Sequence, residues 1–154
     1  RCQFYKGRAD WAAIRGVKDA VTIPVIANGD IVDVASARQA LAQSGTDGVM
    51  IGRGAQGRPW LLAEVAHALY GTPAPQVPTG ADFADMVMAH YTEMLAFYGT
   101  VLGLRVARKH LGWYMDTAGT SADLRRAVLT AKTPNEALRL LPDALSPWTG
   151  QEAA

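Results

Sequence analysis

The sequence predicts an α/β segment with a parallel sheet, followed by an all-α domain. Between Ile23 and Gly54 the chain twice runs a short apolar strand directly into a loop that contains glycine. A stretch over residues 32–43 with helical spacing joins the two strands, so the pattern is that of a strand–helix–strand unit. Beyond residue 79 the apolar spacing is helical throughout, and no strand signal follows.

The two glycine loops are expected at the same edge of the sheet. The first strand, residues 23–27, opens into Asn28-Gly29-Asp30, and the second, residues 48–51, opens into Gly52-Arg53-Gly54. A right-handed crossover between parallel strands brings both loops to the carboxyl edge. Free backbone N–H groups in two adjacent loops, together with one arginine, are typical of a phosphate site.

This arrangement favours the end of a (β/α)₈ barrel, where the loops after the last two strands hold a phosphate and a short extra helix completes the site. Ala55-Gln56-Gly57 fits that extra turn, and Pro59 suits the first position of the next helix. Two strands cannot bury themselves. Because the chain begins at Arg1 and soon enters a helix that needs an earlier strand to pack upon, we expect a fragment whose upstream part is missing.

The elements of the first part follow from continuous apolar runs, which suit strands covered by helices on both faces, and from helical spacing. Gly45 is the expected carboxyl cap of the second helix. The predicted order is a loop over residues 1–9, a helix over 11–20, a strand over 22–27, a helix over 32–43, a strand over 47–51 and a helix over 59–69.

Three prolines within residues 71–78 exclude a helix there and disfavour an interior strand, so this stretch is a linker. After it, helices are predicted over 82–98, 104–115 and 122–131, with Ser121 or Thr120 as a cap, and from Pro134 onward. The predicted domains are the barrel portion at 1–70, the linker at 71–79, a helical domain at 80–146 and a tail at 147–154.

Composition excludes several classes of protein. Hydrophobic residues make up 49% and charged residues 19% of the 154 residues, which is enough apolar surface for a globular core. There is no apolar run of membrane-spanning length, and one cysteine fits a reducing compartment, so we expect a cytoplasmic protein. We predict no membrane partner and no metal. Neither half is a polybasic module, since residues 1–79 carry 8 basic and 6 acidic side chains and residues 80–154 carry 7 and 8.

The helix predicted at 104–115 has a basic face. Arg105, Arg108 and Lys109 fall at i, i+3 and i+4, with Gly112 on the same side offering little bulk beside them. Two interpretations remain open: a solvated surface, or cations that contact RNA phosphates. His110 points in an intermediate direction and could instead be a packed core residue. Opposite them lie residues expected to pack against other helices: Leu104, Ala107, Leu111 and Met115. Trp113 and Tyr114 could stack on bases or belong to this core.

Four motifs in order resemble one known family. The strings "IPVIANGDI" and "GVMIGRGAQGRPWL" closely resemble the tRNA-dihydrouridine synthases, specifically their bacterial B-type members. The opening "RCQFYKGRADW" is similar to the segment after the sixth barrel strand of that family. The later "LRVARKHLGWY" is similar to a signature of its carboxyl-terminal helical domain. The resemblance extends to about residue 140. It implies a carboxyl-terminal fragment that holds the last two βα units of a (β/α)₈ barrel and the helical domain.

The resemblance implies an FMN-dependent enzyme that reduces the 5,6 double bond of a uridine in the D-loop of tRNA, with NADPH as reductant. Residues that match the family's two phosphate loops, and hence its FMN site, are Asn28, Gly29, Asp30, Gly52 and Arg53. Residues that match its tRNA-binding domain are Arg105, Arg108, Lys109 and His110. Asp30 could alternatively be a helix cap or turn residue.

The resemblance also places the family's general acid, a cysteine, upstream of this stretch, so no catalytic residue is assigned here and this chain alone is expected to be inactive. Cys2 stands elsewhere in the pattern and is expected to be a small core residue. Two alternatives remain: another FMN-dependent barrel that acts on a free pyrimidine, and a non-catalytic RNA-binding or regulatory module.

Overall fold

A computed structural model describes residues 7–150 of the chain. These residues form two compact units. The first unit extends to Ala55 and also includes Pro59–Pro75, whereas the second comprises Gln56–Arg58 and the residues from Gln76 onward. Cys2 and the first part of the predicted amino-terminal loop lie outside the described residues.

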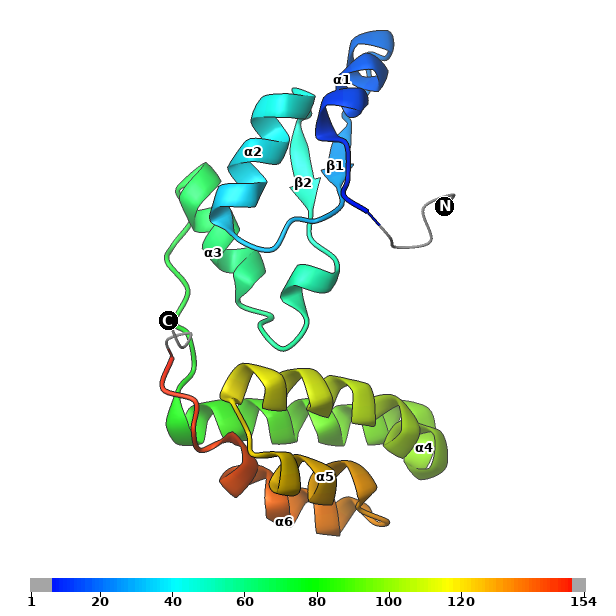
Figure 1. The fold of residues 1–154 in the computed structure, drawn as a ribbon, viewed down its shortest axis with the longest axis vertical. Helices are drawn as coiled ribbons and strands as arrows, with labels where there is room; N and C mark the ends of the chain where they lie inside the picture. Colours follow the sequence, from blue (N-terminus) through cyan, green and yellow to red (C-terminus); the bar gives the residue numbers. More distant parts are fainter. Residues whose placement is uncertain (1–6, 151–154) are drawn as a thin grey trace. The chain divides into compact units, whose positions relative to one another are not determined.

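The first unit contains the predicted strand–helix–strand arrangement (Figure 1). Strands β1 (Ile26–Asn28) and β2 (Gly48–Met50) pair in parallel, with Ile26 opposite Gly48 and Asn28 opposite Met50. The unit also contains helices α1 (Trp11–Ala20), α2 (Val34–Ser44) and α3 (Leu61–Tyr70), and a 3₁₀ turn η1 (Arg53–Ala55). The prediction of a parallel βαβ unit is therefore confirmed.

Several predicted boundaries were wrong by a few residues. The first strand was expected to begin near residue 22, but β1 begins at Ile26, because Pro24 has no backbone N–H and the Val25 N–H donates to the Asp47 side chain at 2.7 Å. The Val25 carbonyl still accepts a hydrogen bond from the Asp47 backbone N–H at 2.9 Å, just ahead of the paired residues. Pro59 is not in a helix. Pro59 and Trp60 form a turn, and α3 begins at Leu61, two residues later than predicted. The short extra turn lies at Arg53–Ala55, two residues earlier than expected.

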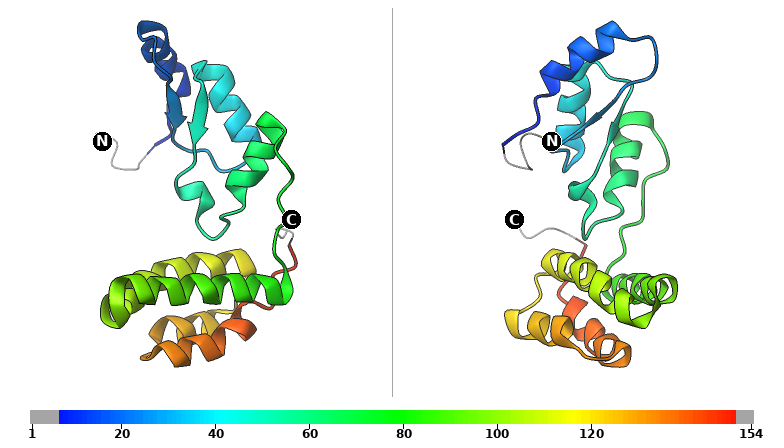
Figure 2. Two further views of the ribbon diagram at one scale, coloured as in Figure 1. Left: turned by 180° about the vertical axis from the view of Figure 1, so that it is seen from behind. Right: turned by 90° about the vertical axis from the view of Figure 1, so that its right-hand side faces the viewer.

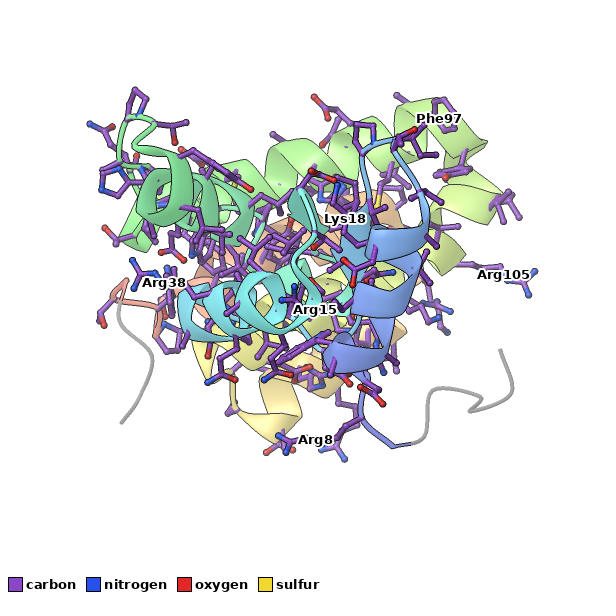
Figure 3. All side chains as sticks on the ribbon, turned by 90° about the horizontal axis from the view of Figure 1, so that it is seen from above. Arg8, Arg15, Lys18, Arg38, Phe97 and Arg105 are labelled. Carbon is purple, nitrogen blue, oxygen red and sulfur yellow. The ribbon has the colours of Figure 1, made fainter. Side chains whose placement is uncertain are left out.

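The helix ends of the first unit follow their local sequence. Asp33 and Ser36 form a reciprocal capping box at the start of α2, and Gly45 ends that helix with a φ of 65°, as predicted for a glycine cap. Arg15 and Lys18 project from α1 (Figure 3). Arg15 donates hydrogen bonds to the carbonyl groups of Ala42 and Gln43, and Lys18 forms an ion pair with Asp47 at 2.8 Å. These contacts fix α1 against the far end of α2 and the start of β2.

The two faces of the small sheet differ in their covering. Ala27 is fully buried beneath the helices, in a unit whose buried core comprises Ile31, Ala37, Ala40, Leu61 and Val65. On the other face, Ile26 and Met50 remain about half exposed. A continuous apolar strand pair with helices on one side only is an incomplete layer by the usual rules of α/β packing.

The second unit consists of α4 (Gly80–Ala118), α5 (Ala122–Thr130) and α6 (Pro134–Leu145). Helix α4 is two helical stretches joined at Gly99, whose φ of 72° and ψ of 162° are non-helical. That backbone conformation is essentially restricted to glycine. The two stretches lie side by side as a hairpin (Figure 2), with Gly103 packed against Leu95. Two helices were predicted here, over residues 82–98 and 104–115. The connection between them is shorter than the expected loop over residues 99–103.

The hairpin packs on α5 and α6 through its buried face. Tyr91 and Leu111 from the two stretches of α4, and Leu141 from α6, are among the largest fully buried side chains. Phe83 places its ring centroid 6.0 Å from that of Tyr114 and 5.8 Å from that of Trp148. The second unit therefore has a hydrophobic core of its own.

Candidate functional site

The five residues predicted for the phosphate loops come together in the first unit. Asn28, Gly29, Asp30, Gly52 and Arg53 all line one cavity of about 360 Å³. Three further residues line it: Gly54, which belongs to the predicted second glycine loop, and Ile31 and Val32, which were not predicted. Ile31 and Val32 carry no distinctive signal in the sequence.

Parallel pairing explains why the cavity forms at this edge. Asn28 and Met50 are register partners at the carboxyl ends of β1 and β2, so the chain leaves both strands at the same level. The loops then pack closely, since a Cβ atom placed on Gly54 would lie 2.3 Å from the carbonyl oxygen of Ile31. Gly54 is therefore required by the contact between the two loops.

Gly29 is constrained on two counts. Its φ is 114°, and a Cβ atom there would lie 2.7 Å from the Cβ of Ala9. The Trp11 indole N–H also donates a hydrogen bond to the Gly29 carbonyl at 2.9 Å. The first loop is thus held in place by the segment that leads into α1.

Gly52 differs from the other glycines of the cavity. A Cβ atom at this position would meet no heavy atom within 4 Å, and its φ does not lie in the left-handed region. Neither backbone conformation nor packing among the described residues requires a glycine here. The missing side chain leaves open space beside the backbone of this loop.

Asp30 and Arg53 are the charged residues that line the cavity. The Arg53 guanidinium lies 3.4 Å from the Asp30 carboxylate, and both side chains are solvent-exposed. Asp30 has a φ of 53° and accepts a hydrogen bond from the Ala9 backbone N–H at 2.6 Å. The cap of α2 is Asp33, so the alternative interpretation of Asp30 as the cap of that helix was wrong. An exposed ion pair of this length is weak.

The predicted basic residues lie on the second stretch of α4. Arg105, Arg108 and Lys109 are exposed, and none of them forms a hydrogen bond or ion pair with another described residue. Gly112 does not leave open space beside them, contrary to expectation. It is buried beneath Arg125, which donates a hydrogen bond to its carbonyl at 2.7 Å.

His110 is set apart from these cations. Its ring is half-buried, with centroids 5.3 Å from His90 and 5.0 Å from Trp113. Burial lowers the pKa of His110, and the nearby His90 and Lys109 lower it further, so the neutral imidazole is favoured near pH 7. Tyr114 belongs to the core, while Trp113 is half-buried.

Two other kinds of site were sought in residues 7–150. No helix in that range is long and apolar enough to cross a membrane. Nor does that range hold a group of three or more histidine, cysteine, aspartate or glutamate side chains placed to bind a metal ion.

Comparison with known proteins gives a consistent assignment. A "Probable tRNA-dihydrouridine synthase" of Rhodobacter capsulatus is 56% identical over 146 residues, which cover 95% of this chain and 44% of that protein. A protein of the same name from Rickettsia conorii is 48% identical over 87% of this chain and 40% of its own length. The "tRNA-dihydrouridine synthase B" of Xanthomonas axonopodis pv. citri is 47% identical over 93% of this chain and 43% of its own length.

The chain thus spans less than half the length of these curated relatives. The sequence profile of the family described as dihydrouridine synthase (Dus) matches residues 1–147, nearly the whole chain. The chain therefore belongs to the dihydrouridine synthase family.

Proposed function

We propose that the protein carrying this chain reduces uridine to 5,6-dihydrouridine in the D-loop of tRNA, with FMN as cofactor and NADPH as reductant. Family membership and the names of the relatives support the reaction and the substrate. The observation that carries the cofactor assignment is the convergence of two glycine loops and Arg53 on one cavity. In this proposal the cytoplasm is where the protein meets its tRNA substrate.

The first unit would be an arc of a (β/α)₈ barrel. Its two parallel strands have helices on one side, while Ile26 and Met50 are exposed on the other, as expected for residues that face a barrel interior. Further strands would pair with the edges of this sheet. The loops after β1 and β2 would then be the last two phosphate-binding loops of the barrel.

The residues present fit a phosphate monoester. Open space at Gly52 lets an anion approach the backbone N–H groups, and the exposed Arg53 guanidinium can donate two parallel hydrogen bonds to phosphate oxygens. Asn28 and Asp30 would contact the ribityl chain next to that phosphate. When bound, the flavin would supply the hydride that reduces the uracil ring.

The second unit would bind the tRNA. Arg105, Arg108 and Lys109 are exposed cations within about one helical turn, which suits contact with successive phosphates without reading of bases. An enzyme acting on a free pyrimidine would have no use for such a surface. This observation favours tRNA over a small-molecule substrate. The test is an assay for dihydrouridine formation in tRNA by the protein that carries this chain.

Arg53→Ala is expected to weaken FMN binding by about 1.5–3 kcal/mol, the usual value of a hydrogen bond to a charged group. The phosphate would then keep its backbone donors alone. The measurement is the affinity of the apoprotein for FMN, followed by flavin fluorescence.

Arg126→Ala is the matched control, because Arg126 is also exposed and ion-paired but lies in the second unit, with Asp123 as its partner. The control should bind FMN as the wild type does. Equal FMN affinity in wild type and Arg53→Ala would show that Arg53 does not contact the FMN phosphate.

A further inference from the structure

A groove runs between the two stretches of α4, on the surface of the second unit. Its volume is about 440 Å³, and the residues that line it are His90, Glu93, Met94, Phe97, Tyr98, Val106 and His110. Arg105, Arg108 and Lys109 do not line it, whereas His110, the fourth residue predicted to bind RNA, does. Nothing in the proposed contacts between cations and phosphates uses this groove.

Phe97 is the most exposed large apolar side chain of the described residues, at 82%. Its ring meets that of Tyr98 edge to face, with centroids 4.8 Å apart. Burial in the protein core therefore does not explain this phenylalanine. A water-exposed aromatic face at the rim of a groove is suited to stacking on another flat ring.

Several aromatic and imidazole rings line the groove or pack beside it. His90 and His110 pack edge to face, and the His90 Nδ1 atom lies 3.0 Å from the hydroxyl oxygen of Tyr114, which is buried in the core. Trp113 packs edge to face on His110. These contacts hold one wall of the groove in a defined shape.

Glu93 supplies the hydrogen-bonding group of the groove. Its side chain is exposed, and it forms no hydrogen bond or ion pair within residues 7–150. An ionised carboxylate only accepts hydrogen bonds. Guanine alone among the four common RNA bases presents two adjacent donors, N1–H and N2–H, on its Watson–Crick edge, so it can satisfy both carboxylate oxygens.

The charges beside the groove indicate a polyanionic ligand. Arg105 and Lys109 immediately precede the groove residues Val106 and His110, so each lies about 100° round the helix from one of them. Arg105 extends outward from α4, the helix that also carries Phe97 (Figure 3). A nucleotide seated in the groove would therefore have cations beside its phosphates.

We propose that the groove between the two stretches of α4 holds one unpaired guanine base of the bound tRNA. The base stacks on Phe97, and the Glu93 carboxylate accepts hydrogen bonds from its Watson–Crick edge. The proposal rests on tRNA binding by the second unit and adds a base-reading site to it.

Phe97→Ala tests the stacking contact in the protein carrying this chain. The affinity for tRNA should fall about tenfold, a typical loss for one stacked base. The slope of log affinity against log salt should not change, because no phosphate contact is lost. Phe97→Trp should restore the affinity. Val101→Ala is the control, since Val101 is 80% exposed on the same helix but does not line the groove.

Photocrosslinking tests the identity of the base. Transcripts of tRNA that contain 6-thioguanosine should crosslink to the peptide that carries Phe97 and Tyr98, and transcripts that contain 4-thiouridine should not. Glu93→Gln should reduce the 6-thioguanosine crosslink several-fold, since the amide presents one acceptor in place of two.

The outcomes separate this proposal from the proposed function. A wild-type protein that does not bind tRNA would contradict tRNA binding itself. Wild-type binding that is unchanged in Phe97→Ala, or crosslinks of 4-thiouridine in place of 6-thioguanosine at this peptide, would overturn the guanine site alone.

Discussion

Gly52→Val is expected to lower the affinity for FMN on the order of 100-fold while leaving the thermal stability of the apoprotein unchanged. The Cβ atom of the new side chain would enter open space, with no heavy atom within 4 Å. Folding should therefore tolerate it. The isopropyl group would, however, keep a phosphate away from the loop N–H groups, and two lost hydrogen bonds to a charged group account for a factor of this size.

Gly54→Ala is the matched comparison. A Cβ atom there would lie 2.3 Å from the Ile31 carbonyl oxygen, so the two loops must separate and both FMN affinity and apoprotein stability should fall. FMN titration and thermal unfolding without FMN measure the two properties separately, since bound ligand raises the apparent stability. If Gly52→Val binds FMN as the wild type does, the phosphate does not approach this loop.

Periodicity and glycine placement were sufficient to predict the strand–helix–strand unit and the meeting of its loops. Apolar runs that end in glycine mark buried parallel strands, and a right-handed crossover leaves one arrangement for the loops that follow. The strand limits were less predictable. Residues 22–25 have the composition of a strand, but the Val25 N–H donates to the Asp47 side chain, while the Val25 carbonyl accepts from the Asp47 backbone N–H. That contact depends on tertiary structure.

Interactions between side chains distant in sequence were not predictable. Asp30 and Arg53 stand 23 residues apart, and their ion pair depends on how the two loops meet. The same holds for Gly112, which the helical pattern placed on an open face but which Arg125 of α5 covers. Helical spacing gives the direction of a side chain on its own helix, and a neighbouring helix decides whether that direction is open.

The hairpin of α4 contains one feature that the sequence predicted and one that it did not. Spacing predicted two helices, and Gly99 lies between them at a backbone conformation that other residues rarely adopt. Nothing in the pattern stated that His90 would meet His110 across the hairpin. The groove, and the exposed Phe97 at its rim, follow from that pairing and could be recognised only in three dimensions.

Replacing Arg105, Arg108 and Lys109 together by alanine is expected to flatten the slope of log tRNA affinity against log salt by up to about 3 units. The affinity near 0.1 M salt should fall on the order of 100-fold or more, because each lost phosphate contact also removes the release of a counterion. FMN affinity and thermal stability should barely change, since these side chains are exposed and make no ion pair with another described residue.

A second triple variant with Arg126, Lys132 and Arg139 changed to alanine provides the control. These cations are also exposed in the second unit, but they lie on or between α5 and α6, so the variant loses the same charge from a different surface. A general effect of net charge would flatten the salt dependence equally in both variants, whereas a specific tRNA surface on α4 would flatten it only in the first. Superimposable salt titrations of the wild type and the α4 variant would mean that these three cations are merely solvated.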